Sequence, residues 1–584
     1  MDFEKKRKEI FQQVAEKGWE GVDPVSCLVP GRKLQDKHSV HSEACGYNLW
    51  QSSYLATAWA MTGREKLAWK VLHTICDYQD TNPGSMTYGN FLAYSGWKKA
   101  LDPNAISFII PPLWYVYKHR ACVMPVSLKR KLEKSFLLAA EALNAHRGGH
   151  LYYTNIILLN LACRLCIADI IKLPRVREVA GWEWEEWRNF ILRMGFIPEY
   201  NAPGYTGVQL HALSIMLACD APKDLHQEIR NVLRQLLADA VLNYHEKIGM
   251  LTGPQSRGHY IVRGSSLMDT IFHFVLGTPQ PARGCHLWLG VGLSPEYLLP
   301  AVRKLSLPRT NLTFSPGYLR KNYLDQEFAL GSVTSTRKIT NPETPVFLAY
   351  ASTNPCCGIA FVPAPRYESH FAAQKKEKLL SATCWLLTKK QIDTHSRGKF
   401  SGLNTGCPHT LVPERKFQPA YRIYLGEKGA VKIYDEQGKQ WPFDFSTRKP
   451  LTEGLLLQTE TIYAGIRFFN PELSAPVAKL SLQADHLVLL VESSCCSLQI
   501  NRLEAATFFG LALQVSPVRK ENNPCSLIPK ISGIKRTRKG WKVYGLFFPG
   551  QKLILKIEPV QSVFYTLKRE EITPHLFYLS DSCF

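Results

Sequence analysis

The hydrophobic residues of this 584-residue chain change their spacing about halfway along it. In the first half they recur every three or four positions, which predicts amphipathic helices. The expected helical segments are residues 47–79, 128–145, 154–172, 184–196, 208–221 and 224–246. Stretches rich in Gly, Pro and Asn separate them, at 81–105, 145–155, 199–207 and 251–266. This pattern favours helical hairpins stacked around a ring, with polar loops gathered at one end.

After about residue 305 the hydrophobic residues alternate with polar ones, which predicts strands. The expected strand segments are residues 343–352, 421–438, 455–469, 478–494, 539–548 and 552–568, with turn signals such as EKGA and DEQGK between runs. We therefore predict an α+β multidomain fold. An (α/α) toroid, or incomplete barrel, would occupy residues 1–305, and an antiparallel β-sandwich would occupy residues 306–584.

Composition places the chain among ordinary soluble proteins, with 45% hydrophobic and 21% charged residues. No run of about 20 apolar residues predicts a transmembrane helix. The start, MDFEKKRKEIF, lacks the apolar core of a secretory signal, so we expect a cytoplasmic protein. The 16 cysteines are scattered along the chain and do not show the spacing of a disulfide framework. Cys163 and Cys166 lie in an apolar run and are interpreted as buried helical thiols.

The net charge of +22 favours an anionic partner. Nucleic-acid-binding motifs, a P-loop and a dinucleotide fingerprint are all missing, so we expect no nucleic acid, no membrane and no cofactor. The histidines show no metal-ligand spacing, as the positions of His259, His273, His286 and His370 illustrate. A metal ion that supports the sandwich structurally would leave no sequence signature. The oligomeric state stays open, a homo-oligomer included.

Five segments carry motifs. They are MTYGNFLAYSGWKKALDPNAISF (86–108), YYTNIILLNL (152–161), EYNAPGYTGVQLHAL (199–213), LTGPQSRGHY (251–260) and DQEFALGSVTS (325–335). As a set, with the patterns GNF–W–DxNA–F, TN–LL, E-[FY]-N-x-P-x-Y and GP–SR–Y, they resemble polysaccharide lyases of the heparinase II/III-like and alginate-lyase-like architecture. The chain departs from that pattern at Ala202 and Gly204, where the family has Ser and Thr.

The resemblance implies cleavage of an acidic, uronic-acid-containing oligosaccharide or polysaccharide by β-elimination. Removing the proton next to a carboxylate requires groups that stabilise the developing enolate charge. Asn155 or Asn201, together with Arg257, would neutralise that carboxylate. The partner expected for the chain is thus an anionic oligosaccharide.

β-Elimination also requires a base at C5 and an acid at the leaving oxygen O4. Tyr205 would be the acid, and it could also serve as the base, because a nearby Arg favours the phenolate. His211 or Tyr260 is the other candidate base. Loop residues would contact the sugar, and the candidates are Asn90, Trp97, Asp102, Asn104 and Tyr153.

Each candidate also has a structural interpretation. Asn155 could cap a helix, Asn201 could form a turn, and His211 could be a core histidine. Tyr205 could be a buried aromatic, Arg257 could form a structural ion pair, and Glu199 could cap a loop. The catalytic interpretation depends on the joint placement of these residues at one rim.

Two other functions stay open. A glycoside hydrolase needs two carboxyl groups, about 5 Å apart for retention or about 6.5–9.5 Å apart for inversion. Glu199 and Asp102 are the best candidates, because Glu183, Glu185 and Glu186 are predicted to lie in the acidic first turn of a helix. The chain could also be a non-catalytic glycan-binding protein whose aromatic loops stack on sugars.

Overall fold

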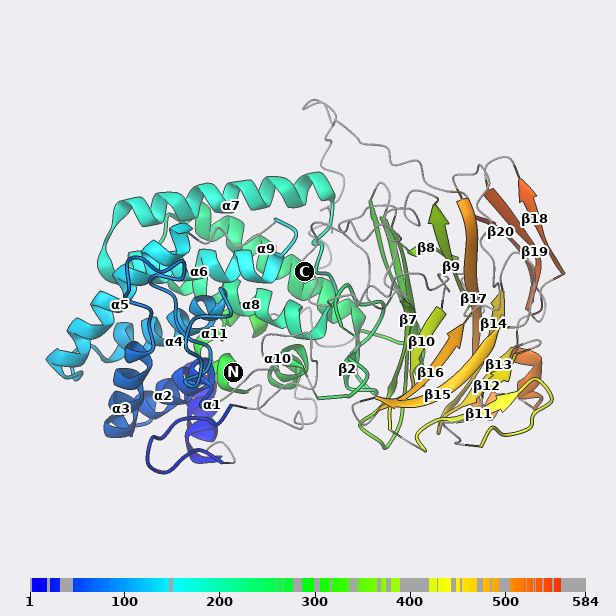
Figure 1. Ribbon diagram of the computed structural model, residues 1–584, viewed down its shortest axis with the longest axis horizontal. Coiled ribbons are helices and arrows are strands. Elements are labelled where there is room, and N and C mark those ends of the chain that lie inside the picture. Colours follow the sequence, from blue (N-terminus) through cyan, green and yellow to red (C-terminus); the bar gives the residue numbers. More distant parts are fainter. Residues whose placement is uncertain are drawn as a thin grey trace.

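The computed structural model shows a helical part followed by antiparallel sheets, side by side in Figure 1. It describes residues 3–557 except for 18–20, 32–45, 146–150, 259, 265, 277–285, 299–304, 316–317, 336–343, 345, 365–368, 374–379, 389–419, 428, 443–447, 452–453, 470–475, 484–485, 493–504, 521, 529, 531, 538–539 and 549–550. Part of the strand predicted at 552–568 lies outside the described residues. The predicted α+β multidomain fold class is confirmed.

Helices alternate between two layers. The described helices are α1 (Phe3–Lys17), α2 (Leu49–Met61), α3 (Glu65–Asp77), α4 (Ala105–Arg120), α5 (Val126–Ala145), α6 (Thr154–Ile171), α7 (Pro174–Met194), α8 (Pro203–Ala218), α9 (Lys223–Asn243), α10 (Leu267–Leu276), α11 (His286–Gly292) and the 3-10 turn η2 (Pro295–Leu298). Helices α2, α4, α6 and α8 are buried almost all round, whereas α3, α5, α7 and α9 bury one face. The buried helices therefore form an inner layer, and the amphipathic ones cover it.

The inner helices contact one another in the order α2, α4, α6 and α8. Helix α11 contacts both α8 and α2, which closes the inner ring. Helix α6 is long and apolar enough to cross a membrane by composition, with a mean hydropathy of 1.7, but 89% of it is buried inside the protein. Its position against α4, α5, α7 and α8 explains why Cys163 and Cys166 are buried there.

Several helices differ from the sequence prediction, since α1, α4, α10 and α11 lie outside every predicted helical segment. Helix α7 begins at Pro174 rather than near residue 184, so Glu183, Glu185 and Glu186 lie in its middle and not in an acidic first turn. Pro174 occupies the first helical turn, where its missing N–H costs nothing. Helix α4 was not predicted, because Pro111 and Pro112 normally end a helix.

The β part contains two large antiparallel sheets. The nine-stranded sheet has the order β12-β15-β16-β10-β7-β6-β5-β4-β3, and the six-stranded sheet has the order β11-β13-β14-β17-β9-β8. Their strands are β3 (Arg309–Ser315), β4 (Tyr318–Leu324), β5 (Phe328–Ser335), β6 (Val346–Tyr350), β7 (Gly358–Ala364), β8 (Ser369–Ala373), β9 (Leu380–Thr388), β10 (Ala420–Tyr424), β11 (Lys432–Asp435), β12 (Arg448–Pro450), β13 (Leu455–Gln458), β14 (Ile462–Phe469), β15 (Val477–Gln483), β16 (His486–Glu492) and β17 (Ala505–Pro517).

Smaller β elements complete the described chain. A three-stranded sheet is formed by β18 (Gly533–Thr537), β19 (Gly540–Phe548) and β20 (Gln551–Ile557). The hairpin β1 (Tyr244–His245) and β2 (Met250–Leu251) belongs to the helical part. It leads from α9 into the loop of residues 252–266.

The nine-stranded sheet is covered on both faces. On one face Leu330 and Leu348 pack with Ile466 of the six-stranded sheet, which makes a sandwich core. On the other face Phe347 and Ala349 pack against residues after α9, including Met250. Strand β6 is therefore buried at every position, as expected of a strand with two covered faces.

Polar contacts join the helical part to the nine-stranded sheet. Arg320 on β4 pairs with Asp239 on α9. Asn322 on the same strand donates to Asn243 Oδ1 at 3.1 Å and to Thr252 Oγ1 at 3.0 Å. These side chains lie directly behind the loop that carries residues 252–266, so the sheet supports that loop.

Candidate functional site

The inner helices run parallel, which brings their first turns to one end of the ring. Contacts between neighbours advance together along the chain. For α4 and α6 they run from Ser107 with Asn160 to Trp114 with Asp169. For α6 and the segment of α8 they run from Asn155 with Glu199, just before α8, to Cys166 with Cys219, just after it. The Gly-, Pro- and Asn-rich stretches precede these first turns. Their polar side chains are therefore placed at the same end of the helical part.

The break between α7 and α8 is made by Asn201. Its backbone has a φ of +46°, in the left-handed region that Asn tolerates better than most residues. Its side chain donates to the carbonyl oxygens of Thr252 at 2.8 Å and Pro254 at 2.9 Å. Pro203 then begins α8. Asn201 thus turns the chain and holds the 252–266 loop through Nδ2, while its buried Oδ1 has no hydrogen-bond partner. Its role toward a substrate carboxylate stays a prediction.

Glu199 lies at the centre of the gathered residues. Its side chain is 4% exposed, and its carboxylate accepts a hydrogen bond from the Asn155 N–H at 2.7 Å and from Arg257 Nη1 at 2.6 Å. It therefore caps the first turn of α6, where a negative charge is stabilised. Burial raises the pKa of Glu199, while Arg257 and the Asn155 N–H act in the opposite direction.

Arg257 is held between two aromatic rings. The carbon at the centre of its guanidinium is 4.0 Å from the ring centroid of Tyr205 and 4.9 Å from that of Tyr153. Burial opposes the charge of Arg257, but Tyr205 and Glu199 outweigh it and raise the pKa of the guanidinium. The Arg257 side chain remains 29% exposed, so a positive charge is presented at the rim.

Tyr260 joins this group through Gly204. A Cβ atom on Gly204 would lie 2.4 Å from the Tyr260 hydroxyl oxygen. Glycine at this position therefore lets the hydroxyl approach the first turn of α8, next to Tyr205. Gly204 is one of the two positions, with Ala202, at which the sequence departs from the motif pattern described above.

Buried acceptor atoms without hydrogen-bond partners surround Glu199. They include Asn155 Oδ1 and Gln209 Oε1, on side chains that are 2% and 0% exposed. Gln209 also donates to the backbone carbonyl of Glu199 at 3.3 Å. Sequence analysis missed Gln209. The available signal was its position one helical turn after Tyr205 on a helix that is mostly apolar.

His211 does not belong to the site. It is 3% exposed, its Nε2 lies 2.9 Å from the Tyr54 hydroxyl, and its ring packs against Trp288. Burial lowers the pKa of His211 to about 3, so the ring is neutral. It is six residues beyond Tyr205, or about 9 Å further along the helix. His211 is thus a core histidine in this structure, and its burial disfavours the role of base, which stays a prediction.

The loop before α4 is built as a support. Asn90 Oδ1 accepts from the N–H of Ile106 at 3.1 Å, and Asn90 Nδ2 donates to the carbonyl of Pro103 at 3.1 Å. Asp102 is 7% exposed and accepts from the Asn104 N–H at 2.9 Å. Trp97 is 6% exposed and packs against Tyr94. Asn90, Trp97 and Asp102 thus shape the loop and are buried, whereas Asn104 and Tyr153 are partly exposed. The roles of all five as sugar contacts stay predictions.

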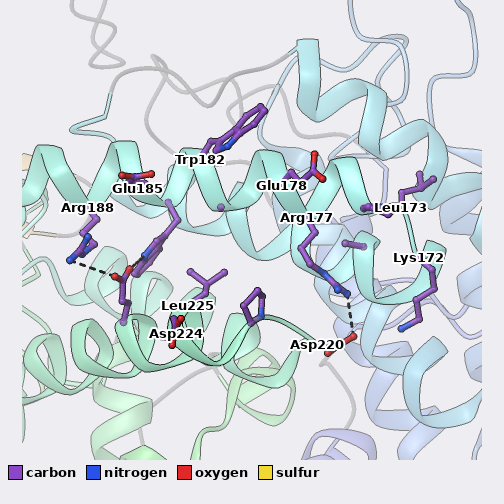
Figure 2. Close-up of a pocket in the computed structure, with 16 residues that line it drawn as sticks. Lys172, Leu173, Arg177, Glu178, Trp182, Glu185, Arg188, Asp220, Asp224 and Leu225 are labelled. Atoms are coloured by element: carbon purple, nitrogen blue, oxygen red, sulfur yellow. Dashed lines mark hydrogen bonds and ion pairs between the residues drawn. The ribbon is translucent and has the colours of Figure 1, made fainter.

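A wide groove lies away from these residues, between α7 and α9. Its volume is about 680 Å³, and its lining includes Trp182, which is 68% exposed. Figure 2 shows the Arg177–Asp220 ion pair at one end of the groove and Arg188 at the other. None of the predicted site residues lines it. Within the described part of the chain, no three His, Cys, Asp or Glu side chains gather as a metal site.

Comparison with known proteins gives a family model and similar structures. A model described as a domain of unknown function, DUF8769, matches residues 63–283, which include every candidate site residue. No curated protein matches the sequence. A heparinase III structure is similar at a TM-score of 0.46 and 9% identity, covering 87% of this chain and 82% of that chain.

Two further structures illustrate the range of similarity. A heparinase III gene product covers 95% of this chain and 90% of its own, at a TM-score of 0.41 and 10% identity. A chondroitin AC lyase from Streptomyces coelicolor, in complex with chondroitin sulphate, covers 87% of this chain and 78% of its own, at a TM-score of 0.31 and 9% identity.

Proposed function

We propose that this protein is a carbohydrate-active enzyme that cleaves an acidic, uronic-acid-containing oligosaccharide by β-elimination. The observation that carries the proposal is the Arg257 guanidinium, 4.0 Å from the Tyr205 ring centroid and partly exposed. A fixed cation beside a phenol is suited to a reaction that combines an anionic substrate with proton transfer. No cofactor is needed for this chemistry.

The residues divide the reaction between charge stabilisation and proton transfer. Arg257 would bind the uronate carboxylate and stabilise the negative charge that develops when the C5 proton leaves. Tyr205 would take that proton as a phenolate, a form favoured by the adjacent guanidinium. The electron pair forms the C4–C5 double bond as the O4 bond breaks. Tyr260 or Tyr205 would protonate the leaving oxygen.

The side chain of Asn155 supports the same assignment. It stands in the first turn of α6, next to the Glu199 carboxylate, and its buried Oδ1 has no hydrogen-bond partner. Only the Nδ2 group of this amide would donate to a carboxylate, because Oδ1 only accepts, and at 2% exposure the residue would need the substrate to reach into the rim. The net charge of +22 also favours the approach of an anionic oligosaccharide.

Glycoside hydrolysis is less well supported. Both oxygens of the Glu199 carboxylate accept hydrogen bonds, and the side chain is 4% exposed. Asp102 is 7% exposed and accepts from a backbone N–H in its own loop. A hydrolase needs one carboxylic acid to protonate the leaving oxygen and a second carboxylate on the other side of the sugar. Neither candidate is presented to a substrate in that way.

The test is to incubate the purified protein with a panel of uronic-acid oligosaccharides and to follow ultraviolet absorbance. β-Elimination creates a conjugated unsaturated uronate, which absorbs ultraviolet light. Hydrolysis creates no such product. We expect absorbance to rise with wild type, and Tyr205→Phe to lower the rate by at least about 100-fold, because it removes a proton-transfer group. New reducing ends without absorbance would indicate a hydrolase. Binding without any product would indicate a glycan-binding protein.

A further inference from the structure

Glu199 joins three segments that carry the groups of the proposed reaction. Its carboxylate accepts from the Asn155 N–H at the start of α6 and from Arg257 in the 252–266 loop. Its backbone carbonyl accepts from Gln209 on α8, the helix that carries Tyr205. These segments lie far apart in the sequence, and a single buried residue fixes their relative positions.

The carboxylate itself is not available to a substrate. Its side chain is 4% exposed, and each oxygen already accepts one short hydrogen bond, at 2.6 Å and 2.7 Å. Hydrogen bonds of this length to an ionised group are among the strongest in proteins. Glu199 is therefore suited to holding other groups in place, and not to exchanging a proton with a sugar.

The orientation of the Arg257 guanidinium depends mainly on its hydrogen bond to Glu199. The guanidinium also contacts the ring faces of Tyr153 and Tyr205, but ring faces restrain the direction of the N–H groups weakly. The hydrogen bond to Glu199 fixes which N–H groups point inward and which remain at the exposed edge. The same carboxylate fixes the first turn of α6, from which the Asn155 side chain projects.

We propose that Glu199 is a positioning residue that orients Arg257 relative to Tyr205. This inference rests on the β-elimination proposed above. A Gln at position 199 has nearly the same shape but a single acceptor oxygen, so it cannot serve both Arg257 and the Asn155 N–H. The Glu199→Gln variant should therefore loosen the catalytic arrangement while the fold persists.

The test is a double-mutant cycle on kcat and KM, with wild type, Glu199→Gln, Arg257→Gln and the double variant. We expect Glu199→Gln to lower kcat by about tenfold or more and to change KM by less than about threefold, because orientation matters most in the transition state. If Glu199 acts through Arg257, the double variant should have the kcat of Arg257→Gln within about twofold. Glu178→Gln, an exposed carboxylate on α7, is the control and should leave both constants unchanged.

Several outcomes decide between the ideas. Losses that multiply in the double variant, or a Glu199→Gln kcat within about twofold of wild type, would overturn the positioning role. A wild type that forms no unsaturated product would overturn the proposed function and this inference with it. Should Glu199→Gln fail to fold, Glu199→Asp replaces it in the cycle, since it keeps the charge but is one methylene too short to reach both partners. It should then lower kcat without the full loss of Arg257→Gln.

Discussion

At the scale of residues, the site depends on close approaches that leave no room for larger side chains. Gly204 is the clearest example, because a Cβ atom there would lie 2.4 Å from the Tyr260 hydroxyl oxygen. The obstacle is the end of a movable side chain, so the backbone need not shift. A substitution at position 204 should therefore change the candidate site without changing the fold.

We predict that Gly204→Ala lowers activity without lowering stability. The added methyl group displaces the Tyr260 hydroxyl, and we expect the rate of uronate product formation to fall by about tenfold, a loss typical of a misplaced proton-transfer group. Ala has a higher helix propensity than Gly by about 1 kcal/mol, so the free energy of unfolding should stay level or rise.

The matched control is Gly181→Ala in the middle of α7. A Cβ atom there meets nothing within 4 Å. This variant should raise the free energy of unfolding by about 0.5–1 kcal/mol and leave activity unchanged. Chemical denaturation and steady-state rates measure both effects. Equal activities for Gly204→Ala and wild type would show that Tyr260 does not serve in the reaction.

At the scale of elements, depth along an inner helix decides which residues reach the rim. Tyr205 stands in the first turn of α8, whereas His211 lies about two turns further and contacts Tyr54 inside the ring. The histidine is held neutral there, because burial lowers its pKa to about 3. An unfolded chain, by contrast, protonates the same histidine near its ordinary pKa of about 6.5.

We predict that His211 makes the protein less stable as pH falls. Between about pH 6.5 and pH 3 the unfolded state binds a proton that the folded state excludes, so the contribution of His211 is present above that window and is lost within it. The slope is at most about 1.4 kcal/mol per pH unit. Asp269, with a pKa raised to about 6 by burial, acts in the opposite direction, so the difference between two proteins must be measured.

The comparison is between wild type and His211→Gln, by urea unfolding at pH values from about 4 to 7. The variant cannot titrate at position 211, so its stability should fall less steeply than that of wild type. Its stability at neutral pH will be lower, because the contacts of the ring with Tyr54 and Trp288 are lost. Parallel curves would mean that His211 is protonated in the folded protein.

The limits of sequence reasoning also appear at this scale. Periodicity predicted α8 from residue 208 onward, with Tyr205 still in the loop before it, and it predicted part of the strands of the two large sheets, β6, β10, β11 and β13 to β16. Packing against a core imposes this spacing of apolar residues. Periodicity missed α4, since Pro111 and Pro112 are tolerated in a helix whose contacts are tertiary. The positions of the loops predicted that Asn155, Glu199, Arg257 and Tyr205 would lie near one another. Contacts in the structure join all four residues. The sequence could not separate these from His211, because depth along a helix needs the start of that helix.

At the scale of the whole molecule, the two parts of the chain are joined by buried polar groups. Arg320 is 2% exposed and pairs with Asp239, whose side chain is 31% exposed. Asn322, on the same strand, donates to Thr252 at the start of the loop that carries Arg257. The nine-stranded sheet therefore supports the candidate site, because Asn322 holds the start of the loop that carries Arg257.

We predict that Asp239→Ala weakens this junction and separates the unfolding of the two parts. Removing Asp239 takes away the carboxylate partner of the buried Arg320. Because the Asp239 side chain is 31% exposed, the cost should lie between that of a surface pair and the value of about 3–5 kcal/mol for a fully buried pair. The cost falls on contacts between the parts and not on either core. Calorimetry should therefore show one heat-absorption peak for wild type and two for the variant. Asp220→Ala, which removes an exposed partner of Arg177, should cost under about 1 kcal/mol and keep a single peak. If the two variants behave alike, the Arg320–Asp239 pair does not couple the parts, and the support of the candidate site must come from the apolar contacts of β6 and β7 with residues 248–262.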